Sequence, residues 1–129
     1  MSLEDKDKKI LTHCHPNLEK LFQRVALRYP LKIIEGYRTK EEQAKMFEEK
    51  KSKVEWPNSK HNSYPSKAVD VAPTPIDWTD TEKFYHFAGF VQAIALEMGI
   101  EIRWGGDWDQ DLNLKEERFL DLVHFELVE

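Results

Sequence analysis

The chain has 129 residues, of which 40% are apolar and 33% charged, a balance typical of one globular domain (1–129) with a modest core. The net charge of -5 argues against a general nucleic-acid binder, which would usually present a basic surface. No apolar run suits membrane insertion, no signal-peptide core follows the charged N-terminus, and the single cysteine excludes an internal disulfide, so we expect synthesis in the cytoplasm.

The first predicted elements follow a charged segment, residues 1–15, which we expect to be loosely ordered. Asn17 can cap a helix over residues 18–29, because the apolar residues of this stretch fall on one helical stripe. Pro30 ends that helix. Residues 31–35 then have the composition of a short strand, which the following glycine breaks.

The middle of the chain is predicted to alternate between helix, loop and strand. Thr39 and Glu42 resemble a capping box, so a second helix should run over residues 40–50. Residues 51–66 are polar, contain two prolines and indicate a loop. Residues 67–72 alternate in polarity as a strand does, before two further prolines stop it.

The C-terminal part adds one helix and two strands. Thr79 or Asp80 can cap a third helix over residues 82–98, and residues 100–104 and 122–128 are strand candidates. Helices segregated against a small, mostly antiparallel sheet predict an α+β domain.

Two histidines and one aspartate form a candidate metal site. His61 lies in the long loop, His124 lies on the last strand, and Asp70 lies on a strand where Ala68 and Ala72 share its face and leave room. Three such ligands leave a fourth zinc position open, where a metal-bound water becomes a nucleophile near neutral pH. The competing interpretation is a surface histidine and a solvated aspartate, which is the commoner state of these residue types.

Three further charged residues are candidates for the chemistry. Asp121 is a candidate general base, but it precedes His124 by three residues and therefore must lie in a turn or bulge at the strand entrance. Glu126 shares a face with His124 and could orient it, take part in proton transfer, or be a solvated edge carboxylate. Arg38 could hold a substrate carboxylate, steady an oxyanion, or pair with the glutamates that begin the next helix.

Other features are weaker candidates. The tract His13-Cys14-His15 lacks a second cysteine at finger spacing, so we expect no structural zinc there. Three alternating aspartates suggest a calcium loop but lack its central glycine and its twelfth-position glutamate, so only a weak calcium site stays open. They are Asp107, Asp109 and Asp111. Trp104 and Trp108 flank a glycine pair and either line a substrate cleft or pack in the core.

Taken together, these segments resemble the zinc-dependent D-Ala-D-Ala carboxypeptidase and L-alanyl-D-glutamate endopeptidase family of peptidoglycan hydrolases. The matching ligand motifs are Ser59-x-His61, Ala68-x-Asp70 and Asp121-x-x-His124-Phe125. The matching flanking segments are Glu35-Gly36-Tyr37-Arg38-Thr39 with Gln43, and Trp104-Gly105-Gly106-Asp107-Trp108. The similarity runs from about residue 31 to residue 127, with the motifs in the order of the family. Several phage endolysins of this group are also single short domains without signal peptides.

The resemblance implies the compact α+β fold that this family shares with the hedgehog signalling domain and with D,D-peptidases. It implies one zinc ion on His61, Asp70 and His124, with Asp121 as the catalytic acid/base and Arg38 contacting substrate or stabilising the transition state. Substrate-binding or supporting roles around this site fall to Ser59, Gln43, Trp104, Trp108 and Glu126.

The expected function is that of a monomeric zinc metallopeptidase that cuts the peptidoglycan stem peptide between L-alanine and D-glutamate. The alternatives are a D-Ala-D-Ala carboxypeptidase and a non-catalytic module that binds cell wall and keeps the zinc fold, although the presence of Asp121 argues against the second. If the chain is of phage origin, it would reach the wall after release by a holin or a similar agent.

One departure from the family pattern concerns the interval between His61 and Asp70. The family usually has a shorter interval that contains a glycine, whereas Pro65-Ser66 stands here where the glycine is expected. We therefore expect the loop that carries His61 to bulge differently and to reshape the cleft wall.

Overall fold

The computed structural model describes residues 3–52, 54–108, 110, 112 and 121–128. Its elements are α1 (Asp5–Leu11), α2 (Pro16–Val25), β1 (Leu31–Glu35), α3 (Lys40–Glu48), the 3-10 helix η1 (Lys60–Asn62), β2 (Ala68–Pro73), α4 (Thr81–Glu97), β3 (Ile102–Trp104) and β4 (His124–Leu127). The four strands form one antiparallel sheet in the order β1-β2-β4-β3. This arrangement confirms the predicted α+β class.

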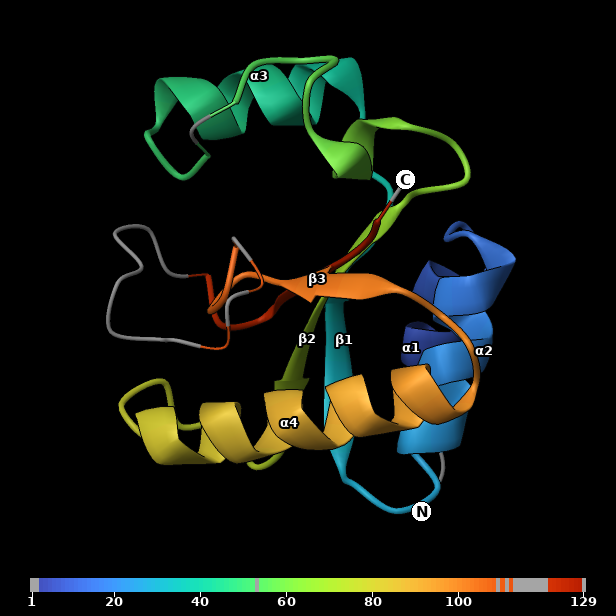
Figure 1. Cartoon of the computed structure of the whole chain (residues 1–129). Helices are drawn as coiled ribbons and strands as arrows, with labels where there is room; N and C mark the ends of the chain where they lie inside the picture. Colours follow the sequence, from blue (N-terminus) through green and yellow to red (C-terminus); the bar gives the residue numbers. More distant parts are fainter. Residues whose placement is uncertain (1–2, 53, 109, 111, 113–120, 129) are drawn as a thin grey trace.

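The helices are distributed unequally around the sheet. Helices α2 and α4 pack against each other, and α4 also contacts β2 and β3, so these two helices and one face of the sheet enclose the core. In Figure 1, α4 lies across one side of the sheet, while α3 lies on the side opposite to α4. The sheet therefore has an apolar face covered by α2 and α4 and a second face on the side of α3.

Strand alternation separates core residues from site residues. On β2 and β4, Val69, Val71 and Phe125 are fully buried in the apolar core. Because successive side chains of a strand point to opposite faces, Asp70 and His124 project from the other face. These two residues are direct partners in the β2–β4 register. Pairing of two correctly predicted strands is what brings these two side chains together.

The helix ends follow local capping signals. Thr39 Oγ1 accepts the Glu42 N–H at 3.2 Å and a Glu42 carboxylate oxygen accepts the Thr39 N–H at 2.8 Å, which is the predicted capping box of α3. Helix α2 begins earlier than predicted, because Pro16 occupies its first position and the His15 ring, not Asn17, provides the cap. Helix α2 ends at Val25, four residues before the predicted end, and α3 ends at Glu48, two residues before its predicted end.

The N-terminal segment differs from the loosely ordered segment expected over residues 1–15. Residues 5–11 form α1, and Leu11 and Cys14 are buried in the core. The Asp7 carboxylate is buried too, where it accepts the backbone N–H of Ile33 on β1 at 3.0 Å. A buried aspartate that binds an edge strand takes the place of an apolar residue, and this hid the amphipathic pattern of α1.

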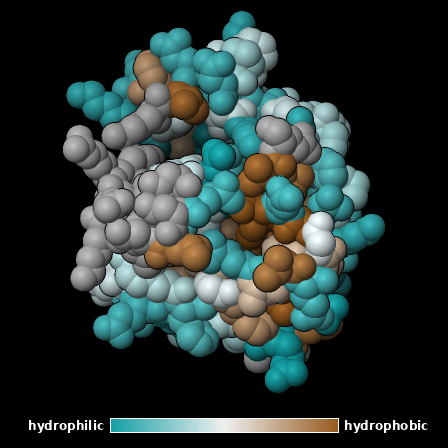
Figure 2. Space-filling view, viewed as in Figure 1, coloured by the Kyte–Doolittle hydropathy of each residue, from teal (hydrophilic) through white to brown (hydrophobic). Residues whose placement is uncertain are grey.

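The surface of the molecule is largely polar in the view of Figure 2, with hydrophobic side chains visible near its centre around β3. Among the described residues, no helix combines the length and the apolar character that crossing a bilayer requires. Strand β3 is an edge strand of only three residues, which limits the length of backbone available for pairing with another chain.

Candidate metal centre and active site

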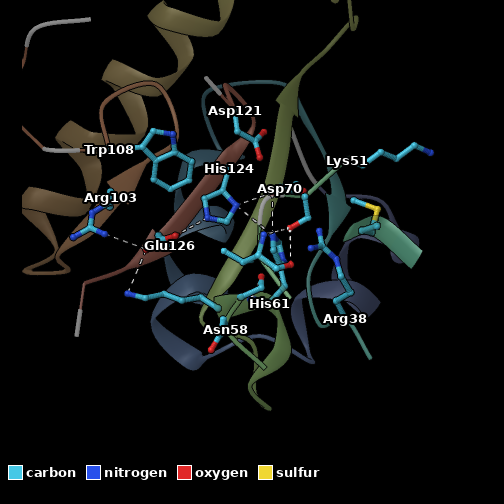
Figure 3. Close-up of a pocket in the computed structure, with 15 residues that line it drawn as sticks. Arg38, Lys51, Asn58, His61, Asp70, Arg103, Trp108, Asp121, His124 and Glu126 are labelled. Atoms are coloured by element: carbon cyan, nitrogen blue, oxygen red, sulfur yellow. Dashed lines mark hydrogen bonds and ion pairs between the residues drawn. The ribbon is translucent and has the colours of Figure 1, made fainter. Parts of the chain in front are cut away.

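Three potential ligand atoms form a nearly equilateral triangle on the face of the sheet opposite the apolar core. His61 Nε2 lies 3.2 Å from Asp70 Oδ1, and His124 Nδ1 lies 3.3 Å from each of these two atoms. Tetrahedral zinc with ligands at about 2.0–2.1 Å places neighbouring ligand atoms about 3.3–3.4 Å apart. All three residues are buried, and Figure 3 shows their side chains converging. The donor set and its spacing therefore fit a zinc ion.

The other ring nitrogen of each histidine is held by an acceptor. His61 Nδ1 donates to the backbone oxygen of Gly36 at 2.7 Å, and His124 Nε2 donates to the Glu126 carboxylate at 2.8 Å. When the rings are neutral, these bonds leave the lone pairs of His61 Nε2 and His124 Nδ1 for a metal ion, whereas in the metal-free chain a protonated ring nitrogen donates to Asp70 instead. Glu126 thus lies in the orienting position that the sequence suggested.

A short local structure positions His61. Ser59 Oγ accepts the backbone N–H of His61 at 3.2 Å and caps η1, the single turn that carries the ligand. The backbone oxygen of His61 in turn accepts the Arg38 N–H at 2.8 Å. Ser59 also lines the cleft.

Asp121 lies in a turn before β4, as its candidate role required. Its backbone oxygen accepts the His124 N–H at 3.1 Å, and its own N–H donates to the Gly105 oxygen at 2.9 Å. A Cβ atom on Gly105 would lie 2.1 Å from that Asp121 oxygen, so only glycine permits this close approach. The turn aims the Asp121 side chain into the cleft that also contains the three ligands.

The charges of the site affect one another strongly. Burial and the nearby Asp70 charge raise the pKa of Asp121 above its usual range. Burial opposes ionisation of Asp70, but hydrogen bonds from His124 and His61 hold its pKa well below the usual range. Burial likewise opposes protonation of His124, yet its bonds to Asp70 and Glu126 raise its pKa to about 9 in the metal-free chain. Asp70 therefore stays an anion, while the pKa of Asp121 is shifted in the opposite direction.

Arg38 is buried, and hydrogen bonds to two neighbouring side chains hold its guanidinium in place. Its Nε and Nη2 donate to the two Glu35 carboxylate oxygens at 2.7 and 3.1 Å, and its Nη1 donates to Gln43 Oε1 at 2.7 Å. The ion pair is thus with Glu35, not with the glutamates that begin α3. Sequence reasoning missed Glu35, although its position three residues before Arg38 was a usable signal. Gln43 supports the arginine and does not line the cleft.

The two tryptophans have different roles. Trp108 lines the cleft, and its ring centroid lies 5.2 Å from that of His124. Trp104 is buried in the core, where its indole N–H donates to the Leu122 oxygen at 2.9 Å, and it does not line the cleft. Of the two positions that the sequence left open for Trp104, the structure shows the core position and not the cleft, because strand alternation on β3 turns this side chain to the core face.

The remaining candidates have structural roles or lie outside the described residues. The backbone of His13 and His15 pairs with that of Ser66, so this tract anchors the long segment between His61 and Asp70. Burial raises the pKa of the Cys14 thiol to about 12, which makes a thiolate ligand unfavourable. Asp109 and Asp111 of the suggested calcium loop lie outside the described residues, and Asp107 accepts the Leu112 N–H at 3.0 Å.

A buried His-Asp-His triad that opens into a cleft beside a carboxylate of raised pKa fits the active site of a zinc metallopeptidase. Comparison with known proteins agrees. A family model described as phage L-alanyl-D-glutamate peptidase matches residues 1–128, so the chain belongs to this family of peptidases.

Two relatives illustrate the similarity. The chain is 33% identical over 107 residues to the L-alanyl-D-glutamate peptidase of Escherichia phage T5, which covers 78% of this chain and 77% of that protein. The structure of the present chain matches the crystal structure of the Serratia marcescens L-Ala D-Glu endopeptidase ChiX with a TM-score of 0.77 and 28% identity. That match covers 99% of this chain and 90% of the other. The predicted family and fold are thereby confirmed.

Proposed function

We propose that this protein hydrolyses the bond between L-alanine and D-glutamate in the peptide stem of peptidoglycan, using one zinc ion held by His61, Asp70 and His124. The observation that carries this proposal is the triangle of ligand atoms, whose sides of 3.2–3.3 Å suit a tetrahedral ion. Membership of the phage L-alanyl-D-glutamate peptidase family supports the choice of bond.

A zinc ion in this position would polarise the scissile carbonyl and lower the pKa of the attacking water. Asp121 accepts a proton from that water and passes it to the leaving amine of D-glutamate. Its place in the cleft beside the three ligands supports this role, because a general acid/base must lie within reach of the proton that it transfers. Trp108 provides an apolar wall beside His124.

Arg38 stabilises the negative charge that develops on the scissile carbonyl oxygen. Glu35 and Gln43 bind three of its nitrogens and leave other N–H groups of the guanidinium free to meet the substrate. Because the guanidinium is held before the substrate arrives, little reorganisation is needed during the reaction. Figure 3 shows Arg38 and Asp121 on different sides of Asp70, which places the cation and the base around one reacting group.

Digestion of purified sacculi tests the proposal. The zinc-loaded protein is expected to release the stem peptide from the disaccharide-linked alanine, giving fragments with a new D-glutamate amine that mass spectrometry identifies. A D-Ala-D-Ala carboxypeptidase would instead release free alanine, and a wall-binding module would release nothing. Either result would refute the assigned bond, provided that elemental analysis finds about one zinc per chain.

Clearing of purified cell wall tests whether the protein acts on this material directly. A peptidase of this kind works on the cell wall, so purified wall should be cleared by added protein. For a chain of phage origin, delivery across the inner membrane by a holin-like agent would precede this step. Adding a chelator should stop clearing and adding zinc should restore it, because loss of the metal ion removes the reactive centre.

A further inference from the structure

A surplus of positive charge lies at the Glu126 end of the cleft. Arg103 is the direct partner of Glu126 in the β3–β4 register, and both strand neighbours of Arg103 are buried in the core. Alternation therefore turns the Arg103 side chain toward the cleft, which it lines. Figure 3 shows Arg103 and Glu126 on the side of His124 away from Arg38.

Lys60 brings a second cation to the same carboxylate. Its Nζ donates to the backbone oxygen of Leu127 and lies 3.4 Å from Glu126 Oε2. Arg103 Nη1 lies 3.7 Å from the same oxygen, while the other Glu126 oxygen accepts from His124. Two cations thus share one carboxylate, and this group of three residues, Lys60, Arg103 and Glu126, carries one excess positive charge.

Arg103 has more unused hydrogen-bond donors than Arg38, which uses three of its N–H groups on Glu35 and Gln43. Its contact with Glu126 is longer than a hydrogen bond, and its buried Nε has no hydrogen-bond partner among the described residues. Its side chain is 35% exposed, against 5% for Arg38, which is neutralised by the bidentate bonds to Glu35. A guanidinium with available donors beside a cleft is suited to bind a carboxylate through two parallel hydrogen bonds.

The proposed substrate offers such a carboxylate. Glutamate has two carboxyl groups, and a stem peptide that continues through one of them leaves the other free, on the same residue whose nitrogen forms the scissile bond. We propose that Arg103, together with Lys60, binds this free carboxylate of the D-glutamyl residue. The enzyme is thereby specific for stems with D-glutamate over stems in which the same carboxyl is an amide. This inference rests on the function proposed above.

The physical reason for this specificity is both charge and donor pattern. An amide lacks the negative charge and directs an NH₂ donor toward Arg103 and Lys60, whose charged side-chain groups are donors only. Because the carboxylate is not a reacting group, its contact is expected to be equal in the ground state and the transition state. Amidation should therefore raise KM by about tenfold or more and leave kcat nearly constant.

Two muropeptides that differ only in this group provide the test, one with D-glutamate and one with D-isoglutamine. The zinc-loaded wild-type chain is compared with Arg103→Gln and with Lys60→Gln, after circular dichroism and zinc content have established folding and loading. Arg24→Gln is the matched control, since Arg24 is an exposed arginine that pairs with Glu97 away from the cleft. Arg103→Lys, which keeps the charge without the fork, should restore part of the preference.

The preference of the wild type for the D-glutamate substrate should fall toward one in Arg103→Gln, fall partly in Lys60→Gln, and persist in Arg24→Gln. Equal KM values of the wild type for the two muropeptides would overturn the inference, and this comparison needs no variant to fold. A preference that survives Arg103→Gln would also overturn it. Failure to cleave either muropeptide would instead refute the proposed function, so the two failures are distinguishable.

Discussion

The carboxylate of Asp121 has no ligand role in the triangle and projects into the same cleft, so its removal should separate catalysis from metal binding. Asp121→Asn keeps the size of the side chain but cannot accept a proton. We expect kcat to fall by about 10²–10⁴-fold, the usual contribution of general acid–base catalysis. Zinc content should stay near that of the wild type, and Asp77→Asn, at an exposed aspartate, should change neither quantity. Retention of full activity would exclude Asp121 as the base.

Glu35 is the second residue whose contribution can be isolated. Glu35→Gln removes the charge that accepts two hydrogen bonds from the buried Arg38 guanidinium. We expect the free energy of unfolding to fall by about 1–3 kcal/mol, the cost associated with losing a hydrogen-bonded charge partner. Urea denaturation measures this loss. The matched control is Glu97→Gln, which breaks the exposed pair with Arg24 and should cost about 0–1 kcal/mol. Equal losses in both variants would contradict the supporting role of Glu35.

At the scale of elements, the contact between Gly105 and the Asp121 turn fixes how β3 leads into the site. Gly105→Ala would place a Cβ atom 2.1 Å from the Asp121 backbone oxygen, so the turn must move. We expect loss of activity together with a lower melting temperature. Gly89→Ala in α4 is the control, because a Cβ there meets nothing within 4 Å and alanine favours helix by about 1 kcal/mol. A Gly105→Ala chain with normal activity would show that the turn tolerates displacement.

The elements also show how far sequence reasoning reaches. The strands that carry Asp70 and His124 were predictable because one face of each packs in the apolar core while the other carries the polar side chains of the site, although both faces are buried. The capping pair at Thr39 predicted the start of α3 for a similarly local reason. Helix α1 was missed because one of its buried positions is Asp7, whose partner lies 26 residues away on β1. Long-range pairing of a polar side chain leaves no local pattern.

Residues of the candidate site could be named from the sequence, but their supporting contacts could not. His61, Asp70, His124 and Asp121 were identified from motifs that resemble a known family, and their geometry agrees with a shared ion. The carbonyl that orients His61 belongs to Gly36, and a backbone atom carries no sequence signal. For Trp104 the choice between cleft and core stayed open, because the sequence does not specify which face of β3 packs against the helices.

At the scale of the whole molecule, stability and metal binding should respond to pH in opposite ways. In the metal-free chain the pKa of His124 is about 9, above its ordinary value of 6.5. Because the folded chain binds the His124 proton more tightly than the unfolded chain does, this group contributes its full stabilisation below pH 6.5. The contribution is lost as the pH rises through 9. Asp70, whose pKa is lowered, contributes above its ordinary value of 3.8 and loses this contribution in acid. Metal-free protein should therefore be most stable between about pH 4 and 6.5.

Zinc requires the neutral imidazole, so its binding must displace the His124 proton. We expect the dissociation constant for zinc to decrease by about tenfold per pH unit between pH 6.5 and 9, since one proton is released. Competition with a chelator of known affinity measures this slope. The zinc-loaded chain should also keep its melting temperature at pH 9–10, where the metal-free chain loses stability. A dissociation constant that does not vary with pH would contradict the coupling of His124 to Asp70 and Glu126.

The docking of α1 onto β1 through Asp7 has a practical consequence for anyone shortening this protein. Deleting the first dozen residues would remove a helix that contacts the outermost strand of the sheet and would leave the Ile33 amide without its acceptor. A bare strand of this kind readily recruits the matching strand of another molecule. The trimmed product should therefore self-associate on a sizing column, although every catalytic side chain is still present.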